Sequence, residues 1–280
     1  MRLCVIQMDM RLGESAYNFA HAEALLRRAA AEGADTALLP ETWNTGFFPT
    51  DHLPERSDRG GEAVKALCAP LARELNMNIV AGSVSDRRGG RVYNTAYVFD
   101  RQGARLAAYD KTHLFTPMGE HEHYAAGDHL TTFSLDGHKC GLLICYDLRF
   151  PELFRTLALQ GVELLLLPAQ WPAARRYHWE TLTAARAIEN QFFLNLIVRL
   201  ILIFYFKSLC SQKVTGSSVM IIFNIRNLNG FRTQANLYFN NFTFFNAVSL
   251  RYALRKDLIL FQIRPFCSFH LYIKIRICLM

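Results

Sequence analysis

The chain has 280 residues, 51% of them hydrophobic and 20% charged, a composition typical of a soluble globular protein of one large or two small domains. Its seven cysteines are scattered and odd in number, which excludes a disulfide framework, and their spacing provides no metal site. The formal charge of +7 is not a nucleic-acid footprint: residues 197–280 carry 11 Lys and Arg against one acid, Asp257, whereas residues 1–196 carry about −3.

The first two-thirds of the chain alternates strand and helix patterns. The opening MRLCVIQMDM reads as a strand over residues 3–8 and has no features of a signal peptide, so we expect a cytoplasmic protein. Apolar residues then recur at helical spacing from Phe19 to Ala29, with a stop at Gly33. The remaining patterns predict strands over 36–40, 78–84, 140–145 and 163–168, a hairpin over 92–100 and 104–110, and helices over 61–76, from about 151, and over 178–191.

The sequence changes character after about residue 193. Acids, alanine and glycine become rare, and Phe, Ile, Asn and basic residues dominate without an amphipathic period. The apolar run between Arg199 and Lys207 is too short to span a bilayer, which needs about 20 residues. We therefore predict one folded domain over 1–196, followed by an anomalous basic and aromatic segment over 197–280. A frameshift, an unspliced intron or a fused fragment would explain that segment.

Three polar residues directly follow apolar strands: Glu41, Lys111 and Cys145. If they met in space, the carboxylate could take the thiol proton and the ammonium could stabilise an oxyanion, which is covalent acyl chemistry. Taken singly, a cysteine after an apolar strand is more often an inert core residue. A lone Glu or Lys in such a position is usually solvated.

Two other cysteine and histidine patterns are weaker. Cys140 and Cys145 could form a redox pair, but on one extended strand they would lie about 16 Å apart, beyond disulfide reach. The segment GEHEHY, residues 119–124, could suggest a metal, but a polar loop explains it as well.

Three segments in order decide between these readings: LLPETWNTGF (38–47), YDKTHLF (109–115) and GLLICYDLRFPE (141–152). Together they resemble the nitrilase superfamily of carbon–nitrogen hydrolases, and the resemblance covers residues 1–196. It implies that Glu41 is the general base, Lys111 the oxyanion stabiliser and Cys145 the nucleophile. It also implies a substrate-positioning glutamate, for which Glu120 matches best and Glu122 competes.

The resemblance also implies a reaction without a cofactor, in which a carboxamide is hydrolysed through a cysteine thioester, with the backbone N–H of Tyr146 as second oxyanion donor. CYDLRFPEL, PAQWPAARRYHW and ARAIENQFF look most like the ω-amidase branch, whose substrates are dicarboxylate monoamides such as 2-oxoglutaramate. Arg149 could bind the substrate carboxylate or form an internal ion pair. Trp171, Tyr177 and Trp179 could shape the pocket or belong to the core. N-carbamoyl amine hydrolysis, nitrile hydrolysis and an inactive truncated product remain the alternatives.

The fold implied by the resemblance is α+β, a four-layer α-β-β-α sandwich that forms homodimers in most relatives. We expect the protein to bind a small-molecule amide substrate and to bind neither nucleic acid nor a membrane. Relatives continue after ARAIENQFF with strands that complete the second sheet. Here only GSSVMIIFN, residues 216–224, weakly matches that continuation.

Overall fold

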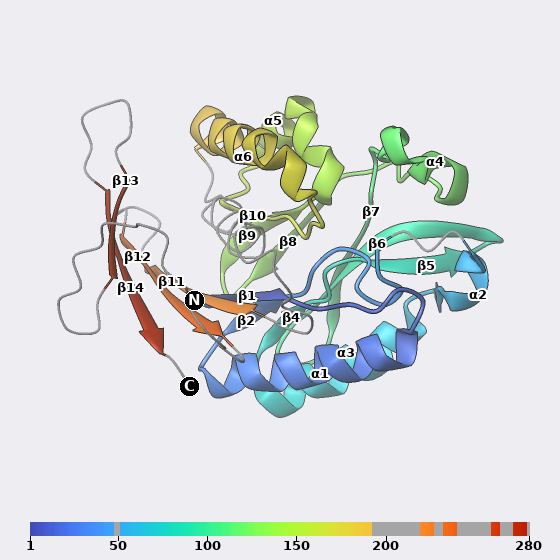
Figure 1. The fold of residues 1–280 in the computed structure, drawn as a ribbon, viewed down its shortest axis with the longest axis horizontal. Coiled ribbons are helices and arrows are strands. Elements are labelled where there is room, and N and C mark those ends of the chain that lie inside the picture. Colours follow the sequence, from blue (N-terminus) through green and yellow to red (C-terminus); the bar gives the residue numbers. More distant parts are fainter. Residues whose placement is uncertain (48–50, 192–218, 227–231, 240–258, 264–270, 279–280) are drawn as a thin grey trace.

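The computed structural model describes residues 1–47, 51–191, 219–226, 232–239, 259–263 and 271–278 (Figure 1). Two sheets lie face to face, and a pair of helices covers the outer face of each, as Figure 1 shows. The order of layers is therefore α-β-β-α. This arrangement buries both faces of both sheets, which explains why the predicted strands are apolar runs without alternation.

The first sheet has β1 (Arg2–Gln7), β2 (Thr36–Leu38) and β4 (Asn78–Val80) as parallel neighbours. The chain then turns back through β6 (Arg91–Phe99), which pairs antiparallel with β4, β5 (Val84–Arg88) and β7 (Arg105–Asp110); β3 (Asp58–Arg59) forms the edge. The outer helices are α1 (Ser15–Ala31) and α3 (Glu62–Leu75), with the short α2 (Leu53–Arg56) beside β5.

The second sheet contains β8 (Thr131–Leu135), β9 (His138–Leu142) and β10 (Leu164–Leu166) in the order β10-β9-β8. Helices α5 (Pro151–Leu159) and α6 (Arg176–Asn190) cover it. The connections contain α4 (Glu120–His123) and three 3-10 turns, η1 (Thr116–Met118), η2 (Cys145–Arg149) and η3 (Ala173–Arg175).

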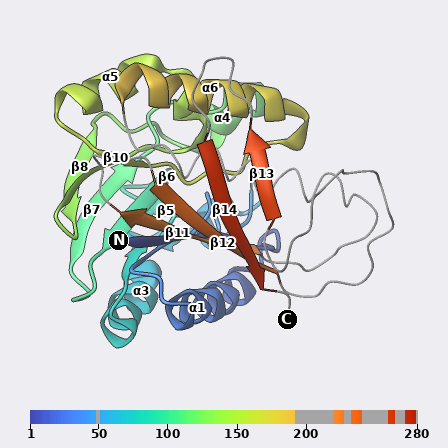
Figure 2. The same ribbon diagram turned by 90° about the vertical axis from the view of Figure 1, so that its left-hand side faces the viewer.

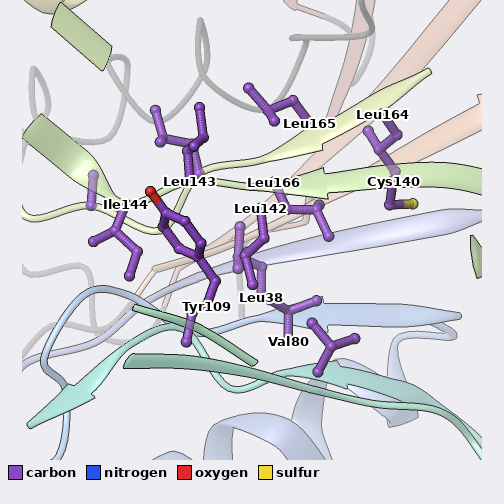
Figure 3. Packing of buried hydrophobic residues seen from close by; sticks show 14 of the residues in the cluster. Leu38, Val80, Tyr109, Cys140, Leu142, Leu143, Ile144, Leu164, Leu165 and Leu166 are labelled. Carbon is purple, nitrogen blue, oxygen red and sulfur yellow. The ribbon is translucent and has the colours of Figure 1, made fainter. Parts of the chain in front are cut away.

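The main core lies between the two sheets. Figure 3 shows side chains of β9 and β10, such as Leu142 and Leu166, facing Leu38, Val80 and Tyr109 of the first sheet. All five are at most 2% exposed. A second cluster fills the space between the first sheet and its helices, and α1 contributes Ala22, Leu25, Leu26 and Ala29 to it. The strands that carry the polar residues singled out above are thus rigidly packed.

The described segments after α6 extend the first sheet. Strand β11 (Val219–Arg226) pairs antiparallel with β1, and β12 (Arg232–Phe239), β14 (Leu271–Cys278) and β13 (Ile259–Ile263) follow in that order (Figure 2). The described part of the weak match at 216–224, residues 219–224, therefore lies in the first sheet next to β1. That part supplies backbone partners to β1, which would otherwise be an open edge.

Two of the predicted strands are broken by turns that their apolar pattern does not show. The run 78–84 divides into β4 and β5 because Gly82, at φ +49°, turns the chain where its Cα passes close to the Pro40 carbonyl. A Cβ at Gly82 would lie 2.0 Å from that oxygen. The run 140–145 is extended only as far as Ile144, and β9 itself ends at Leu142. The other predicted helices and strands, the hairpin of β6 and β7 included, are confirmed within a few residues.

Candidate active site

Glu41 lies in the buried loop that follows β2. Its side chain is 0% exposed. The loop is held against residues 81–83 by backbone bonds, including Ser83 N–H to the Pro40 carbonyl at 3.1 Å, and by Thr42 N–H to Ser83 Oγ at 3.0 Å. The close approach that only Gly82 permits is part of the same contact. The sequence thus fixes a carboxylate at the end of a core strand.

Lys111 directly follows β7 and is 1% exposed. Its Nζ lies 2.9 Å from Glu41 Oε1 and 2.8 Å from Glu120 Oε2, so one ammonium joins two buried carboxylates. Glu120 is 2% exposed and also accepts the Phe115 N–H at 2.5 Å, whereas Glu122 is exposed. The geometry therefore favours Glu120 over Glu122 as the second glutamate of the site.

Asn94, in the middle of β6, connects the same two carboxylates. Its Nδ2 donates to Glu41 Oε1 and to Glu120 Oε1, both at 3.0 Å. Its Oδ1 is buried and has no hydrogen-bond partner within the part of the chain that the structure describes. A buried oxygen without a hydrogen-bond partner costs free energy. The Asn94 amide is therefore placed to donate to the two carboxylates even though its own oxygen lacks a partner among the described residues.

Cys145 begins η2 and has a left-handed backbone, with φ +42°. The parallel pairing with the β10 segment continues up to this point through Leu143 N–H to Leu166 O, 3.1 Å, and Cys145 N–H to Pro168 O, 3.0 Å. Positive φ is strained for a residue with a Cβ and recurs at functional sites. The turn ends the extended chain and places the thiol, 6% exposed, at the edge of the sheet.

Asp147 ties the cysteine turn to the lysine loop. This fully buried carboxylate accepts Ile144 N–H at 2.9 Å and Tyr109 O–H at 2.8 Å through Oδ2. Its Oδ1 accepts His113 N–H at 3.0 Å and Thr112 O–H at 3.1 Å. The segment around Lys111 and the turn at Cys145 are therefore fixed relative to each other.

Gln170, four residues after β10, lies between Glu41 and Cys145. Its backbone N–H donates to Glu41 Oε2 at 2.9 Å, and its carbonyl accepts the Cys145 thiol at 3.6 Å. Its side-chain Nε2 also donates to the Glu41 carbonyl at 2.6 Å. One residue thus orients both the carboxylate and the thiol.

The electrostatics of the cluster keep Cys145 protonated and Lys111 charged. Burial raises the pKa of the Cys145 thiol well above its usual range, and the Glu41 carboxylate raises it further, while Lys111 opposes both. Burial disfavours the charge on Lys111, but Glu41, Cys145 and Glu120 together raise the pKa of that ammonium. The resting site therefore holds a thiol beside a carboxylate that can accept its proton.

A pocket opens over Cys145 and Lys111, with about 300 Å³ of open space. Its walls include Tyr146, Arg149 and Trp171, which the sequence indicated, and also Phe47, Phe115, Gln170, Pro172 and Arg175. Tyr177 is instead 75% exposed on α6, and Trp179 is buried behind Trp171, with ring centroids 5.0 Å apart.

Arg149 lies across this pocket wall on aromatic faces. Its guanidinium carbon is 5.3 Å from the Trp171 ring and 5.6 Å from the Tyr146 ring, and Nη2 lies 3.0 Å from His178 Nδ1. Among the residues described, no carboxylate pairs with it, so the internal ion pair considered above is not found there.

Sequence reasoning missed Asn94, Asp147 and Gln170 as site residues. Asn94 lies in the predicted hairpin strand 92–100 and Asp147 in the motif GLLICYDLRFPE, but nothing in their spacing shows that their side chains point inward. Gln170 acts largely through its backbone, which gives no signal at residue level.

Within the described part of the chain, no group of three or more His, Cys, Asp or Glu side chains could hold a metal ion. No helix in that part is long and apolar enough to cross a membrane.

Comparison with known proteins supports one family. The carbon–nitrogen hydrolase family model matches residues 2–221, which reaches beyond the predicted boundary at 196. The 2-oxoglutaramate amidase of Bacillus subtilis (strain 168) is 40% identical over 188 residues, 67% of this chain and 72% of the relative. Human omega-amidase NIT2 is 34% identical over 203 residues, 68% of this chain and 71% of the relative.

Solved structures agree. XC1258 of Xanthomonas campestris, a CN-hydrolase superfamily protein with an arsenic adduct in its active site, has a TM-score of 0.63 at 33% identity, over 69% of this chain and 73% of that one. A variant of the amidase from Nesterenkonia sp. AN1, with acrylamide added to its active-site cysteine, gives 0.63 at 27% identity over 69% and 76%. The chain belongs to the carbon–nitrogen hydrolase family, as the sequence motifs predicted, and is a hydrolase of carbon–nitrogen bonds.

Proposed function

We propose that this hydrolase is an amidase that converts the terminal amide of a small dicarboxylate monoamide, such as 2-oxoglutaramate, into a carboxylate and ammonia. The observation that carries the proposal is the buried contact of Lys111 with Glu41 beside the Cys145 thiol, at the base of a pocket. The names of the Bacillus subtilis and human relatives support an ω-amide as substrate.

The first half of the reaction transfers the acyl group to sulfur. Glu41 takes the Cys145 proton while the sulfur attacks the amide carbon, because the raised pKa of the thiol leaves little free thiolate beforehand. Lys111 and the Tyr146 N–H, in the first turn of η2, stabilise the oxyanion. Glu41 then returns the proton to the amide nitrogen, the C–N bond breaks, and ammonia leaves a Cys145 thioester.

The second half hydrolyses the thioester. Glu41 takes a proton from a water molecule, the hydroxyl attacks the thioester carbon, and the C–S bond breaks as the proton returns to Cys145. Gln170 keeps one oxygen of Glu41 fixed through its N–H during both halves. Glu120 holds Lys111 in place and is close enough to it to help position the amide.

Arg149 provides the contact for the substrate's carboxylate. It is half-buried at the pocket wall, and no described carboxylate neutralises it. A planar guanidinium resting on aromatic rings can offer a carboxylate two parallel hydrogen bonds. Trp171 gives this end of the pocket its flat apolar wall.

The direct test is ammonia release from 2-oxoglutaramate by the purified full-length protein beside the Cys145→Ala variant. We expect the wild-type protein to turn over the substrate and the Cys145→Ala variant not to. Circular dichroism should show that both are folded. Turnover by Cys145→Ala would refute the nucleophile. Turnover of a nitrile or an N-carbamoyl amine instead, the latter releasing carbon dioxide, would refute the substrate class.

Three further expectations accompany the proposal. We expect a homodimer, measurable by light scattering, and a cytoplasmic location, measurable by cell fractionation. If residues 197–280 arise from a frameshift or an unspliced intron, transcript sequencing will show it, and an inactive, aggregating full-length protein would be the biochemical counterpart.

A further inference from the structure

A second arginine borders the same pocket. Arg175 is the last residue of η3, is half-buried, and lines the pocket together with Cys145 and Arg149. Its guanidinium carbon lies 4.9 Å from the centroid of the Phe115 ring, another wall residue. It therefore rests on an aromatic face, as Arg149 does, and a guanidinium stacked in this way can offer N–H donors in its plane to a planar partner.

Arg175 differs in its contacts from the arginine that follows it. Arg176 pairs with Glu180 one helical turn away, and Arg186 of the same helix pairs with Glu189. In the part of the chain that the structure describes, no carboxylate forms an ion pair with Arg175. A half-buried guanidinium in a pocket without a counter-ion is a favourable site for an anion.

The backbone of Arg175 is fixed by the pocket wall itself. The indole N–H of Trp171 donates to the Arg175 carbonyl at 2.8 Å, and the Arg175 N–H donates to the Pro172 carbonyl at 2.9 Å. The other face of this arrangement is the Arg149 guanidinium over the Trp171 ring. Trp171 thus contacts both arginines, and the turn of η3 fixes the backbone position of Arg175.

Charge explains why two arginines are needed. The buried cluster contains one ammonium, Lys111, and two carboxylates, Glu41 and Glu120, so its formal net charge is −1. This charge lies directly below the position of the amide and would repel an anionic substrate in a poorly screened pocket. Two guanidinium groups at the outer end reverse the sign of the pocket as a whole.

We infer that Arg175 and Arg149 together clamp the carboxylate of the substrate, so that Arg175 determines the preference of the enzyme for anionic over neutral amides. The inference rests on the proposed function and deepens it. The substrate class is short ω-monoamides of dicarboxylic acids, bound with the amide at Cys145 and the carboxylate between the two guanidinium groups.

The test compares kcat/KM for succinamate and for butyramide, which has a methyl group where succinamate has its carboxylate. We expect Arg175→Gln to lower the succinamate-to-butyramide ratio of kcat/KM about 10- to 100-fold, mainly through the KM for succinamate, because the variant loses a charged hydrogen-bond donor. This change corresponds to about 1.4–2.7 kcal/mol. The ratio for Arg175→Lys should lie between those of the wild type and Arg175→Gln, because lysine keeps the positive charge but lacks the two parallel N–H donors of a guanidinium. Arg176→Gln is the matched control and should leave the ratio unchanged.

The outcomes separate the two proposals. Wild-type protein that hydrolyses butyramide but not succinamate would refute the proposed substrate class. Wild-type preference for succinamate that persists in folded Arg175→Gln and Arg175→Lys would leave the proposed function standing and overturn the clamp. Isothermal titration of succinate into Cys145→Ala, with and without Arg175→Gln, gives a readout independent of turnover, and equal affinities would also overturn it.

Discussion

The inner and outer parts of the active site use charge in opposite ways. In the inner cluster, Lys111, Glu41 and Glu120 are all at most 2% exposed, and each charge contacts a group of opposite sign. In the outer pocket, Arg149 and Arg175 are half-buried, rest on aromatic rings and pair with none of the described carboxylates. The inner charges have their partners within the protein, whereas the outer ones are those that we propose to bind the carboxylate of the substrate.

This difference suits the inner cluster to the catalytic step and the outer pocket to the recognition of the substrate. A buried, fully paired cluster needs no reorganisation when an oxyanion develops, which is the condition for electrostatic catalysis. Cations without a partner lose little by binding an anion and gain most from one of matching geometry. Substitutions in the inner cluster should therefore affect stability and kcat, and those in the outer pocket should affect KM.

The largest effect should follow from removing the inner cation. Lys111→Met leaves two carboxylates buried side by side, and breaking a buried ion pair costs about 3–5 kcal/mol. We expect a loss of that size in the free energy of unfolding by urea and no detectable hydrolysis. Lys111→Met with Glu41→Gln and Glu120→Gln should regain stability without regaining activity. If the triple variant were no more stable than the single one, the ion pairs would not be the cause.

Next in size is the loss of the amide that joins the carboxylates. Asn94→Ala removes both hydrogen bonds to Glu41 and Glu120, and we expect kcat to fall about 10- to 100-fold and stability by about 1–3 kcal/mol. The succinamate-to-butyramide ratio should stay constant, because Asn94 is a positioning residue and does not line the pocket. A change in that ratio would contradict the separation of the inner and outer parts.

A smaller effect concerns the nucleophile's proton. The difference in absorbance at 240 nm between wild type and Cys145→Ala follows the thiolate, and its midpoint should lie above the ordinary thiol pKa near 8.5. Glu41→Gln removes a negative charge that raises this pKa, so the midpoint should move to lower pH even though hydrolysis is lost. An unchanged midpoint would mean that burial alone, without Glu41, sets the pKa.

The sequence predicted most of the fold because the sandwich buries whole strands. Continuous apolar runs such as 163–168 and the helical spacing of α1 are direct consequences of that burial. The hairpin of β8 and β9 was missed although its turn, Asp136-Gly137 with φ of +48° and +83°, has a strong hairpin signal. The pairing of β11 with β1 was not predictable, because it joins residues more than 200 positions apart.

The candidate site was predictable mainly from the resemblance of three motifs to the nitrilase superfamily. Position alone marked Glu41, Lys111 and Cys145 only as polar residues after apolar strands, and the structure brings them together. Asp147 and Gln170 act by holding backbone groups, and the left-handed turn at Cys145 depends on tertiary contacts. Such contacts leave no pattern along the chain.

The smallest expected effect lies at the rim of the outer pocket. His178, exposed on α6, places its Nδ1 3.0 Å from Arg149 Nη2, so a neutral ring can accept a hydrogen bond that orients the guanidinium. We expect His178→Ala to raise the KM for succinamate about two- to fivefold, since one exposed hydrogen bond contributes about 0.5–1 kcal/mol, and to leave kcat within error. Tyr177→Ala, at the exposed neighbouring position, is the control and should change neither constant. A lowered kcat in His178→Ala would show instead that the outer pocket acts on the chemical step, and the division between the two parts of the site would fail.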